Sequence, residues 1–271
     1  MAVFFLFLLG LAAGTLATLF WIPEEDLGRG YFQMNALVAL GLLGLAATVA
    51  VLHPFAPFGP RRLEGAAALG LAFAAGLFYW AAVWQQRWRL GRLGAGLALA
   101  GVTAALLLSG SHSLREDIAL PHRPALLILA LVTSAVFLGW SLVTMLLGHW
   151  YLIAPRLSFR HLTVFCRVLV GSTVARIAAV GLTLAVAAAV PATVSPHPLE
   201  AVTSFAAQGM FFWFRVLWGL LGSLVLAFMA LHCARARSNQ SATGILYVLV
   251  VGAFVGEITA LYVTLTTGVP I

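Results

Sequence analysis

The sequence predicts an all-α integral membrane protein, built as a bundle of about eight transmembrane helices. Three observations predict this class. Charged residues make up 8% of the 271 residues and hydrophobic residues 62%, whereas a soluble domain carries about 25% charged residues. The mean hydropathy is +1.04. Apolar runs as long as the roughly 20 residues that a spanning helix needs recur along the whole chain.

Loops rich in proline, glycine and charge separate these runs, and each loop is too short to hold a soluble domain. Residues 1–271 are therefore expected to form a single polytopic membrane domain. The first run, "MAVFFLFLLGLAAGTLATLFWI", has no positively charged start and is longer than the apolar core of a signal peptide, so we interpret it as the first spanning helix. The predicted helices lie near residues 2–22, 34–52, 66–84, 93–111, 125–153, 163–190, 205–233 and 245–267.

The loop arginines indicate the orientation, because cytoplasmic loops carry an excess of basic residues. The first, third, fifth and seventh loops hold eight arginines and the other three loops hold four, which predicts both termini on the non-cytoplasmic side. Arginines scattered through short loops do not form the stripe typical of a nucleic-acid-binding surface. The eight are Arg29, Arg87, Arg89, Arg92, Arg156, Arg160, Arg235 and Arg237, and the four are Arg61, Arg62, Arg115 and Arg123.

Four charged residues fall inside the predicted spans: Arg167, Arg176, Arg215 and Glu257. A charge at the centre of a membrane helix costs about 2.5–3.5 kcal/mol on insertion scales, so it should face a partner or a polar cavity. Arg167 lies close enough to a helix end for its side chain to reach the cytoplasmic surface. Arg215 is expected to reach the outer interface or a cavity there.

Arg176 and Glu257 lie at equal depth, about 18–20 Å from the cytoplasmic ends of the sixth and eighth predicted helices. Their opposite charges predict an intramembrane ion pair. Each follows a pair of small residues spaced four apart, Gly171 and Ala175 before Arg176, and Gly252 and Gly256 before Glu257. Such faces let two helices approach closely, so we expect the sixth and eighth helices to touch. The pair has two interpretations, a structural lock or a proton relay.

The histidines allow several hypotheses. His149 and His232 lie near the cytoplasmic ends of two helices, and two facing histidines are the ligands that a b-type haem needs. The same two residues could instead line a quinone site, or simply sit at the interface. Two cysteines, Cys166 and Cys233, are too few for a four-thiolate zinc or iron–sulfur site, and no metal site is predicted.

Four stretches carry a resemblance to a known family. They are "FLLGLAAGTLATL" in the first helix, "AVLHPFAPFGPRR" at the end of the second, "MFFWFRVLWGLL" in the seventh, and the dipeptide Gly256-Glu257 in the last. Over most of its length the chain loosely resembles the membrane anchor subunit of dimethyl sulfoxide reductase, within the polysulfide-reductase-type quinone-interacting anchors. It departs from that pattern at the Pro-Phe after His53, where the family has Leu-Gly, and at Leu261, where the family has an arginine.

The resemblance implies a membrane subunit of a respiratory electron-transfer complex in a bacterial-type inner membrane. Such a subunit exchanges electrons with menaquinol or ubiquinol and anchors redox partner subunits, such as an iron–sulfur or cytochrome protein. It works as part of an oxidoreductase complex rather than as a stand-alone enzyme. Position by position, the resemblance makes His53 a quinone-binding candidate, with Arg215 and Glu257 as pocket or support residues.

Three alternatives remain open from the residues. One is a b-type cytochrome that binds haem through His149 and His232. The second is a small-solute or proton-coupled transporter, in which Arg176 and Glu257 would act at mid-membrane. The third is a purely structural membrane subunit.

Overall fold

The structure is a computed structural model of the whole chain, and it describes residues 1–19, 22, 24–53, 57–114, 120–153, 160–193, 197–205 and 208–271. Within these residues the fold is entirely helical, and eight helices are long and apolar enough to cross a membrane. The predicted class, an all-α membrane protein with eight spans, is thus confirmed in its architecture.

Seven of the eight spans are formed by one α-helix each, of which the second is kinked near its start, at Gly28. The seventh span consists of three consecutive segments: α8 (Gly209–Phe214), a π-helical turn η2 (Arg215–Gly222) and α9 (Ser223–Arg235). Two further short elements are the 3₁₀ turn η1 (Gly59–Arg61), which begins the third span, and α7 (Pro198–Thr203), which lies between the sixth and seventh spans. The seven single helices are α1 (Ala2–Leu19), α2 (Glu24–Leu52), α3 (Arg62–Trp84), α4 (Trp88–Ser113), α5 (Arg123–Ile153), α6 (Arg160–Ala188) and α10 (Asn239–Thr267).

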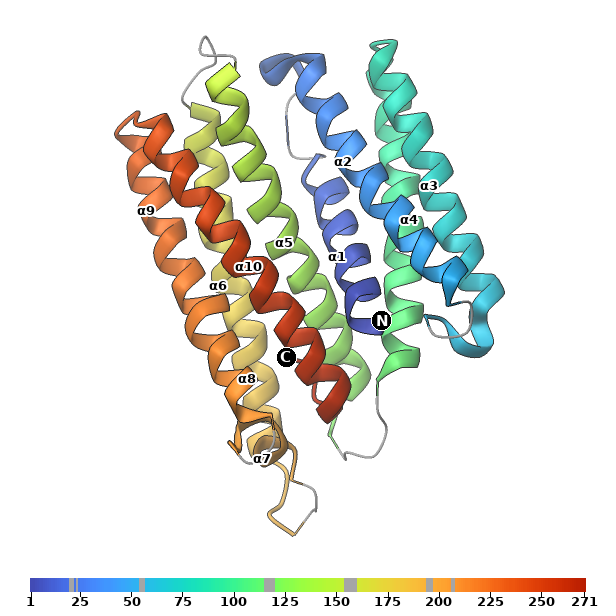
Figure 1. Cartoon of the computed structure of the whole chain (residues 1–271), viewed down its shortest axis with the longest axis vertical. Coiled ribbons are helices and arrows are strands. Elements are labelled where there is room, and N and C mark those ends of the chain that lie inside the picture. The colour runs from blue at the N-terminus through green and yellow to red at the C-terminus, as the bar shows by residue number, and fades with distance from the viewer. Residues whose placement is uncertain are drawn as a thin grey trace.

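The spans form two four-helix halves that lie side by side (Figure 1). In the N-terminal half, α1 packs on α2, α2 on α3, α3 on α4, and α4 back on α1. In the C-terminal half, α5 packs on α6, α6 on α9, α9 on α10, and α10 back on α5. Each half is therefore a ring of four helices. In the C-terminal ring, α5 lies opposite α9 and α6 lies opposite α10.

Helix α1 joins the two halves. It is the most enclosed span, with 78% of its residues buried, because it also packs against α5 and α10 of the other half. At the crossing with α5, Gly14 and Gly139 leave no room for a side chain. A Cβ atom at Gly14 would collide with the carbonyl of Ala135, and one at Gly139 would collide with the backbone of Gly14. The halves therefore meet backbone to backbone.

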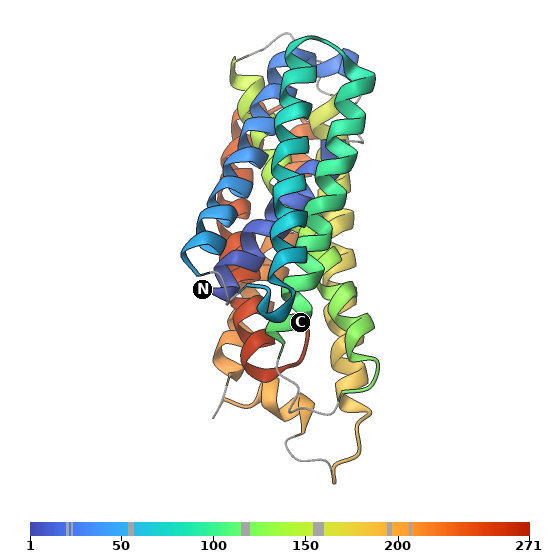
Figure 2. The same ribbon diagram turned by 90° about the vertical axis from the view of Figure 1, so that its right-hand side faces the viewer.

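Two views of the ribbon, related by a rotation of 90°, show the direction in which the chain runs through the bundle (Figures 1 and 2). Helix α1 begins at the end of the bundle where α10 finishes, and both chain ends lie toward that end (Figures 1 and 2). The turn between α3 and α4 lies at the opposite end. Two of the arginines in the orientation count, Arg115 and Arg156, lie outside the described residues.

Candidate functional site: a buried charge cluster in the C-terminal half

Arg176, Arg215 and Glu257 form one buried group, which we call the charge cluster. Glu257 Oε1 accepts hydrogen bonds from Arg176 Nε at 3.1 Å and from Arg215 Nη2 at 2.8 Å. Glu257 Oε2 accepts a bond from Arg176 Nη2 at 2.9 Å. Arg176 is 2% exposed, and Arg215 and Glu257 are not exposed at all. The carboxylate is therefore clamped between two guanidinium groups inside the protein.

All four corners of the C-terminal half contribute to this site. Glu257 comes from α10, Arg176 from α6 and Arg215 from the π-helical turn of the seventh span. Helix α5 supplies Ser134, whose hydroxyl donates to Glu257 Oε2 at 2.6 Å, and Thr133, whose Oγ1 accepts a bond from Arg176 Nη1 at 3.4 Å. The site thus ties the whole ring of helices together through one carboxylate.

Two glycines bring the seventh span against α10 at the level of the cluster. A Cβ atom at Gly219 would lie 2.7 Å from Gly256 Cα, so neither position has room for a side chain. Arg215 precedes Gly219 by four residues and Glu257 directly follows Gly256. The close crossing therefore places the two charged side chains next to each other. Arg215 also begins the π-helical turn, a distortion that is frequent at functional sites.

The polypeptide after α10 covers the outer side of the cluster. Gly268 has a φ of 75°, a left-handed conformation that suits glycine and ends the helix by turning the chain back. The Ile271 amide then donates to Thr264 Oγ1 at 3.1 Å, and the Ile271 main-chain oxygen accepts a bond from Arg176 Nη2 at 2.8 Å. The Ile271 side chain is 2% exposed in an apolar cluster that also includes Val202 and Phe212. The cluster is thereby sealed from this end.

The cluster lies deeper than the sequence predicted. Glu257 is eighteen residues from the start of α10 and Arg176 sixteen from the start of α6, which corresponds to about 27 Å and 24 Å. The predicted depth was smaller because both helices begin several residues earlier than expected. Measured from the other ends, Glu257 is about 15 Å and Arg176 about 18 Å from the last residue of its helix. The site therefore lies in the half of the membrane nearer to where α6 and α10 finish.

The predicted contact between the sixth and eighth helices is wrong. The two helices, α6 and α10, occupy opposite corners of the ring and are not one of its closely packed pairs, although the long Arg176 side chain reaches across to Glu257. Gly252 and Gly256 pack instead on the seventh span, where Gly252 faces Trp218 and Ser223. A Cβ atom at Gly171 would meet no atom within 4 Å. Small-residue spacing indicated a close contact correctly on one helix but assigned it to the wrong neighbour.

Ser134 and Thr133 are members of the site that sequence reasoning missed, and Arg215 was placed in two ways. The family resemblance grouped Arg215 with Glu257, whereas its position in the helix suggested the outer interface or a cavity there; it lies beside Glu257. The signal was present in part, since a glycine stands one helical turn after Arg215 and another stands directly before Glu257. Ser134 gave no signal, because serine is common in membrane helices and its partner is 123 residues away.

Counting side chains alone, the cluster carries an excess of one positive charge, since two arginines face one glutamate. Arg215 uses Nη2 for Glu257, while its Nε and Nη1 atoms have no hydrogen-bond partner among the described residues. Buried polar groups are nearly always hydrogen-bonded, so unpaired donors of this kind call for an explanation. Such a site is suited to bind a molecule that offers an oxygen acceptor or a negative charge.

The structure does not bring His53 to this cluster. His53 is exposed at the end of α2, a helix of the N-terminal half whose neighbours are α1, α3 and, to a smaller extent, α5. The combination of His53 with Arg215 and Glu257, which the family resemblance implied, is therefore not assembled in one place.

His149 and His232 are not brought together either. His149 Nδ1 shares a hydrogen bond with the hydroxyl of Tyr247 at 3.0 Å. Gly148, the residue before His149, packs closely against Thr243 of α10 and leaves no space there for a bulky ligand. His232 is exposed, while its neighbours Leu231 and Ala230 point into the protein. Among the described residues, no three His, Cys, Asp or Glu side chains are grouped so that they could hold a metal ion.

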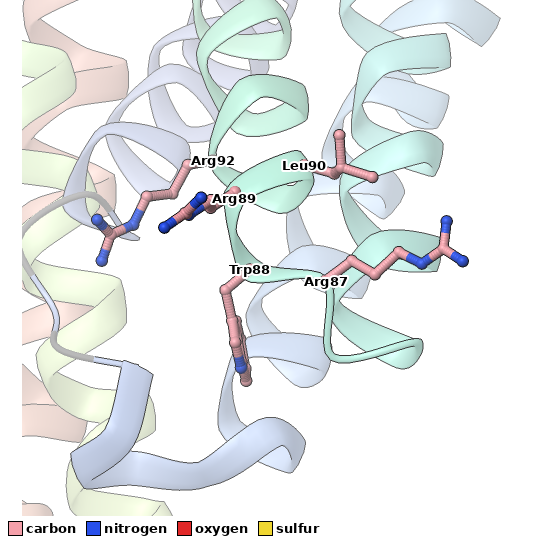
Figure 3. Close-up of a pocket in the computed structure, with 5 residues that line it drawn as sticks. All are labelled: Arg87, Trp88, Arg89, Leu90 and Arg92. Carbon is pink, nitrogen blue, oxygen red and sulfur yellow. The ribbon is translucent and has the colours of Figure 1, made fainter.

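A second group of charges lies at the opposite end of the bundle, where α4 begins. Arg87, Arg89 and Arg92 line a recess of about 500 Å³ together with Trp88 and Leu90 (Figure 3). Arg89 and Arg92 extend to one side of the helix start and Arg87 to the other.

The same end carries a further arginine. Arg29 donates to the carbonyl of Trp84 at 3.3 Å and its guanidinium lies 5.3 Å from the ring centroid of that residue. Arginine and tryptophan side chains together are typical of a membrane border.

Comparison with models of known protein families and with curated proteins gives no match for this chain.

Proposed function

We propose that this chain is the quinone-interacting membrane subunit of a respiratory electron-transfer complex, and that the charge cluster binds the quinone head group. The observation that carries the proposal is the cluster's excess positive charge, held inside the membrane on guanidinium groups that still have N–H bonds to donate. Burying an ionisable residue inside a membrane protein costs free energy, so such a residue is the first candidate for a functional site.

The chemistry of a quinone fits this site. A quinone presents two carbonyl oxygens, which accept hydrogen bonds, and negative charge develops on these oxygens when electrons arrive. Fixed N–H donors and an excess positive charge stabilise that charge without having to reorganise. Arg215 contributes the excess charge, because one arginine would already neutralise Glu257. Glu257 holds the two guanidinium groups in place, and the Ser134 hydroxyl in turn holds the Glu257 carboxylate.

Electrons need a second protein. When a quinol is oxidised to the quinone, two electrons and two protons leave it. We assign the electrons to a partner subunit that carries an iron–sulfur or haem centre, and the protons to water at the membrane surface. The protein described here then serves as the membrane anchor of that partner, with the arginine-rich end on the cytoplasmic side of a bacterial-type inner membrane.

Quinone binding can be tested with Arg215→Gln. This variant leaves Arg176 paired with Glu257, so the buried charges balance and the protein should fold. It removes the excess positive charge, and the loss of one charge-assisted contact predicts about tenfold weaker binding of quinone. The measurement is quenching of tryptophan fluorescence by a naphthoquinone and by a benzoquinone, each with a short isoprenoid chain, in protein reconstituted into nanodiscs.

The matched control is Arg167→Gln, which removes an arginine of α6 that is exposed and lies outside the cluster. It should bind both quinones as the wild type does. If the wild type binds neither quinone, or if Arg215→Gln binds them as tightly as Arg167→Gln, the cluster is a structural lock and the proposed function is wrong.

A further inference from the structure

An apolar groove of about 420 Å³ opens where α1, α5 and α6 meet, at the junction of the two halves. Small residues leave this space free, among them Ala17 on α1 and Gly171 and Ala175 on α6. A Cβ atom at Gly171 would meet nothing within 4 Å, which places open space beside it. Trp140 of α5 forms one wall and is braced edge-on by Phe165, with ring centroids 5.3 Å apart.

One end of this groove lies within one helical turn of residues of the charge cluster. Ala175, which lines the groove, directly precedes Arg176 on α6, and Val136, which also lines it, lies one helical turn from Thr133 on α5. Arg176 Nη1 donates to Thr133 Oγ1 at 3.4 Å, the longest hydrogen bond that Arg176 makes. Thr133 is only partly buried. The α5–α6 seam is therefore the place where the cluster comes close to the surface that faces lipid.

The depth of the charge cluster in the membrane restricts which molecules can occupy the groove beside it. Arg176 lies about 24 Å from one end of α6 and about 18 Å from the other, well inside the hydrocarbon layer. A phospholipid keeps its charged head group at the membrane surface, so its head cannot reach this depth. A quinol is a lipid whose small head group, with two oxygens, resides inside the hydrocarbon layer, and whose chain is apolar.

We propose that the groove between α1, α5 and α6 holds the isoprenoid chain of the quinone and that its head group enters the charge cluster through the seam between Thr133 and Arg176. This rests on the proposed quinone function and adds the side of entry and the site of the chain. Ligand pockets of this kind are mostly apolar with a few polar groups that orient the ligand, and the groove has the volume of such a pocket.

Filling the groove tests the assignment. In Gly171→Leu a leucine side chain takes up space that the isoprenoid chain would use, while every hydrogen bond of the charge cluster is left in place. The matched control is Gly181→Leu on the same helix, because Gly181 is also exposed and also has nothing within 4 Å of its Cβ position, but does not line the groove.

The experiment compares the affinity of each variant for two naphthoquinones, one with an isoprenoid chain and one without. We expect Gly171→Leu to bind the chain-bearing quinone about tenfold more weakly, because apolar contact area is lost, and to bind the chainless quinone like the wild type. Gly181→Leu should match the wild type for both. Bound phospholipid and the oligomeric state are measured on the same samples.

Each other outcome has a distinct meaning. If the wild type binds neither quinone, the proposed function fails. The wild type could bind quinone while Gly171→Leu either lowers the affinity for both naphthoquinones equally or lowers neither affinity. Either result would overturn the groove assignment alone. Loss of a co-purifying phospholipid in Gly171→Leu with unchanged quinone affinity would overturn it in favour of an acyl-chain site. A changed oligomeric state with unchanged quinone affinity would overturn it in favour of a contact with a second copy.

Discussion

The two halves of the molecule have the same ring of four helices but are held together by different means. In the N-terminal half the buried polar residues are few and bond mainly within their own helices, as Thr15 does to the Leu11 carbonyl and Asn35 to the Tyr31 carbonyl. Small residues let its helices approach, for example at Gly101, where a Cβ would lie 2.9 Å from the backbone nitrogen of Ala72. Its described spans contain no buried charge.

In the C-terminal half a charge cluster joins all four corners of the ring. Glu257 accepts bonds from three other spans, two of them through guanidinium groups. Close packing would have been sufficient to build such a half, as its N-terminal counterpart shows. Packing alone therefore does not account for the free energy spent in burying three ionised groups, and this supports placing the proposed function in the C-terminal half.

The largest effect is expected from Glu257→Gln. Two buried arginines would lose the carboxylate that they share, and breaking a buried ion pair in this way costs about 3–5 kcal/mol. The free energy of unfolding in mixed micelles measures it. Glu64→Gln, an exposed acid in the first turn of α3, is the control and should change little. Equal values for the two variants would remove the distinction between the halves.

Exchanging the charges of Arg176 and Glu257 tests whether these two residues form an isolated pair or a cluster with Arg215. In an isolated pair the double variant R176E/E257R would recover the stability that either single variant loses. Here the arginine introduced at position 257 would face Arg215, so recovery should be absent or small. Full recovery of the unfolding free energy would mean that Arg215 does not belong to the cluster.

An intermediate effect is expected where the halves meet. Gly14→Ala would place a methyl group onto the Ala135 carbonyl, and overpacking of this kind costs about 2 kcal/mol. Gly10→Ala on the same helix is the control, because its added carbon would meet only a Leu138 methyl group at 3.9 Å. The same unfolding measurement compares them. If Gly10→Ala is as damaging as Gly14→Ala, the backbone contact does not join the halves.

The smallest effect is expected from Ser134→Ala, which removes one hydrogen bond to Glu257. Hydrogen bonds between membrane helices contribute about 1 kcal/mol. Ser141→Ala is a matched control on the same helix, since the Ser141 hydroxyl bonds only to the Phe137 carbonyl one turn away. The difference in unfolding free energy between the two variants isolates the contribution that crosses between helices, and a difference of zero would show that Ser134 does not support the cluster.

Sequence reasoning succeeded where the physics is local. The eight spans follow from hydropathy, because each must cross the same hydrocarbon layer whatever its neighbours are. The charges of Arg176 and Glu257 stood out for the same reason, since a charge in an apolar run has to find a partner. The starts of several later helices were less accurate, because charged and polar residues at the ends, such as Arg160 and Asn239, lower the hydropathy without ending the helix.

Sequence reasoning was less successful in predicting which helices pack against one another. The order of neighbours depends on which faces pack best, and small residues are so frequent in this chain that their spacing does not select one neighbour. Gly252 and Gly256 were correctly predicted to support a close contact, yet the partner is the seventh span rather than α6. His53, His149 and His232 were candidates by position in the chain, but His53 and His232 are exposed and His149 bonds to Tyr247, and none of the three belongs to the cluster.

Composition and hydropathy along the chain therefore determined that this is a helical membrane protein with eight spans and a costly pair of opposite charges. Only the tertiary structure decided that a second arginine completes the site, that α5 supplies its hydroxyl groups, and that a groove beside it opens to the lipid. The physical reason is that transfer into the membrane is a property of each segment alone. A cluster of three charges forms only when helices from distant parts of the chain are placed at fixed rotations and depths.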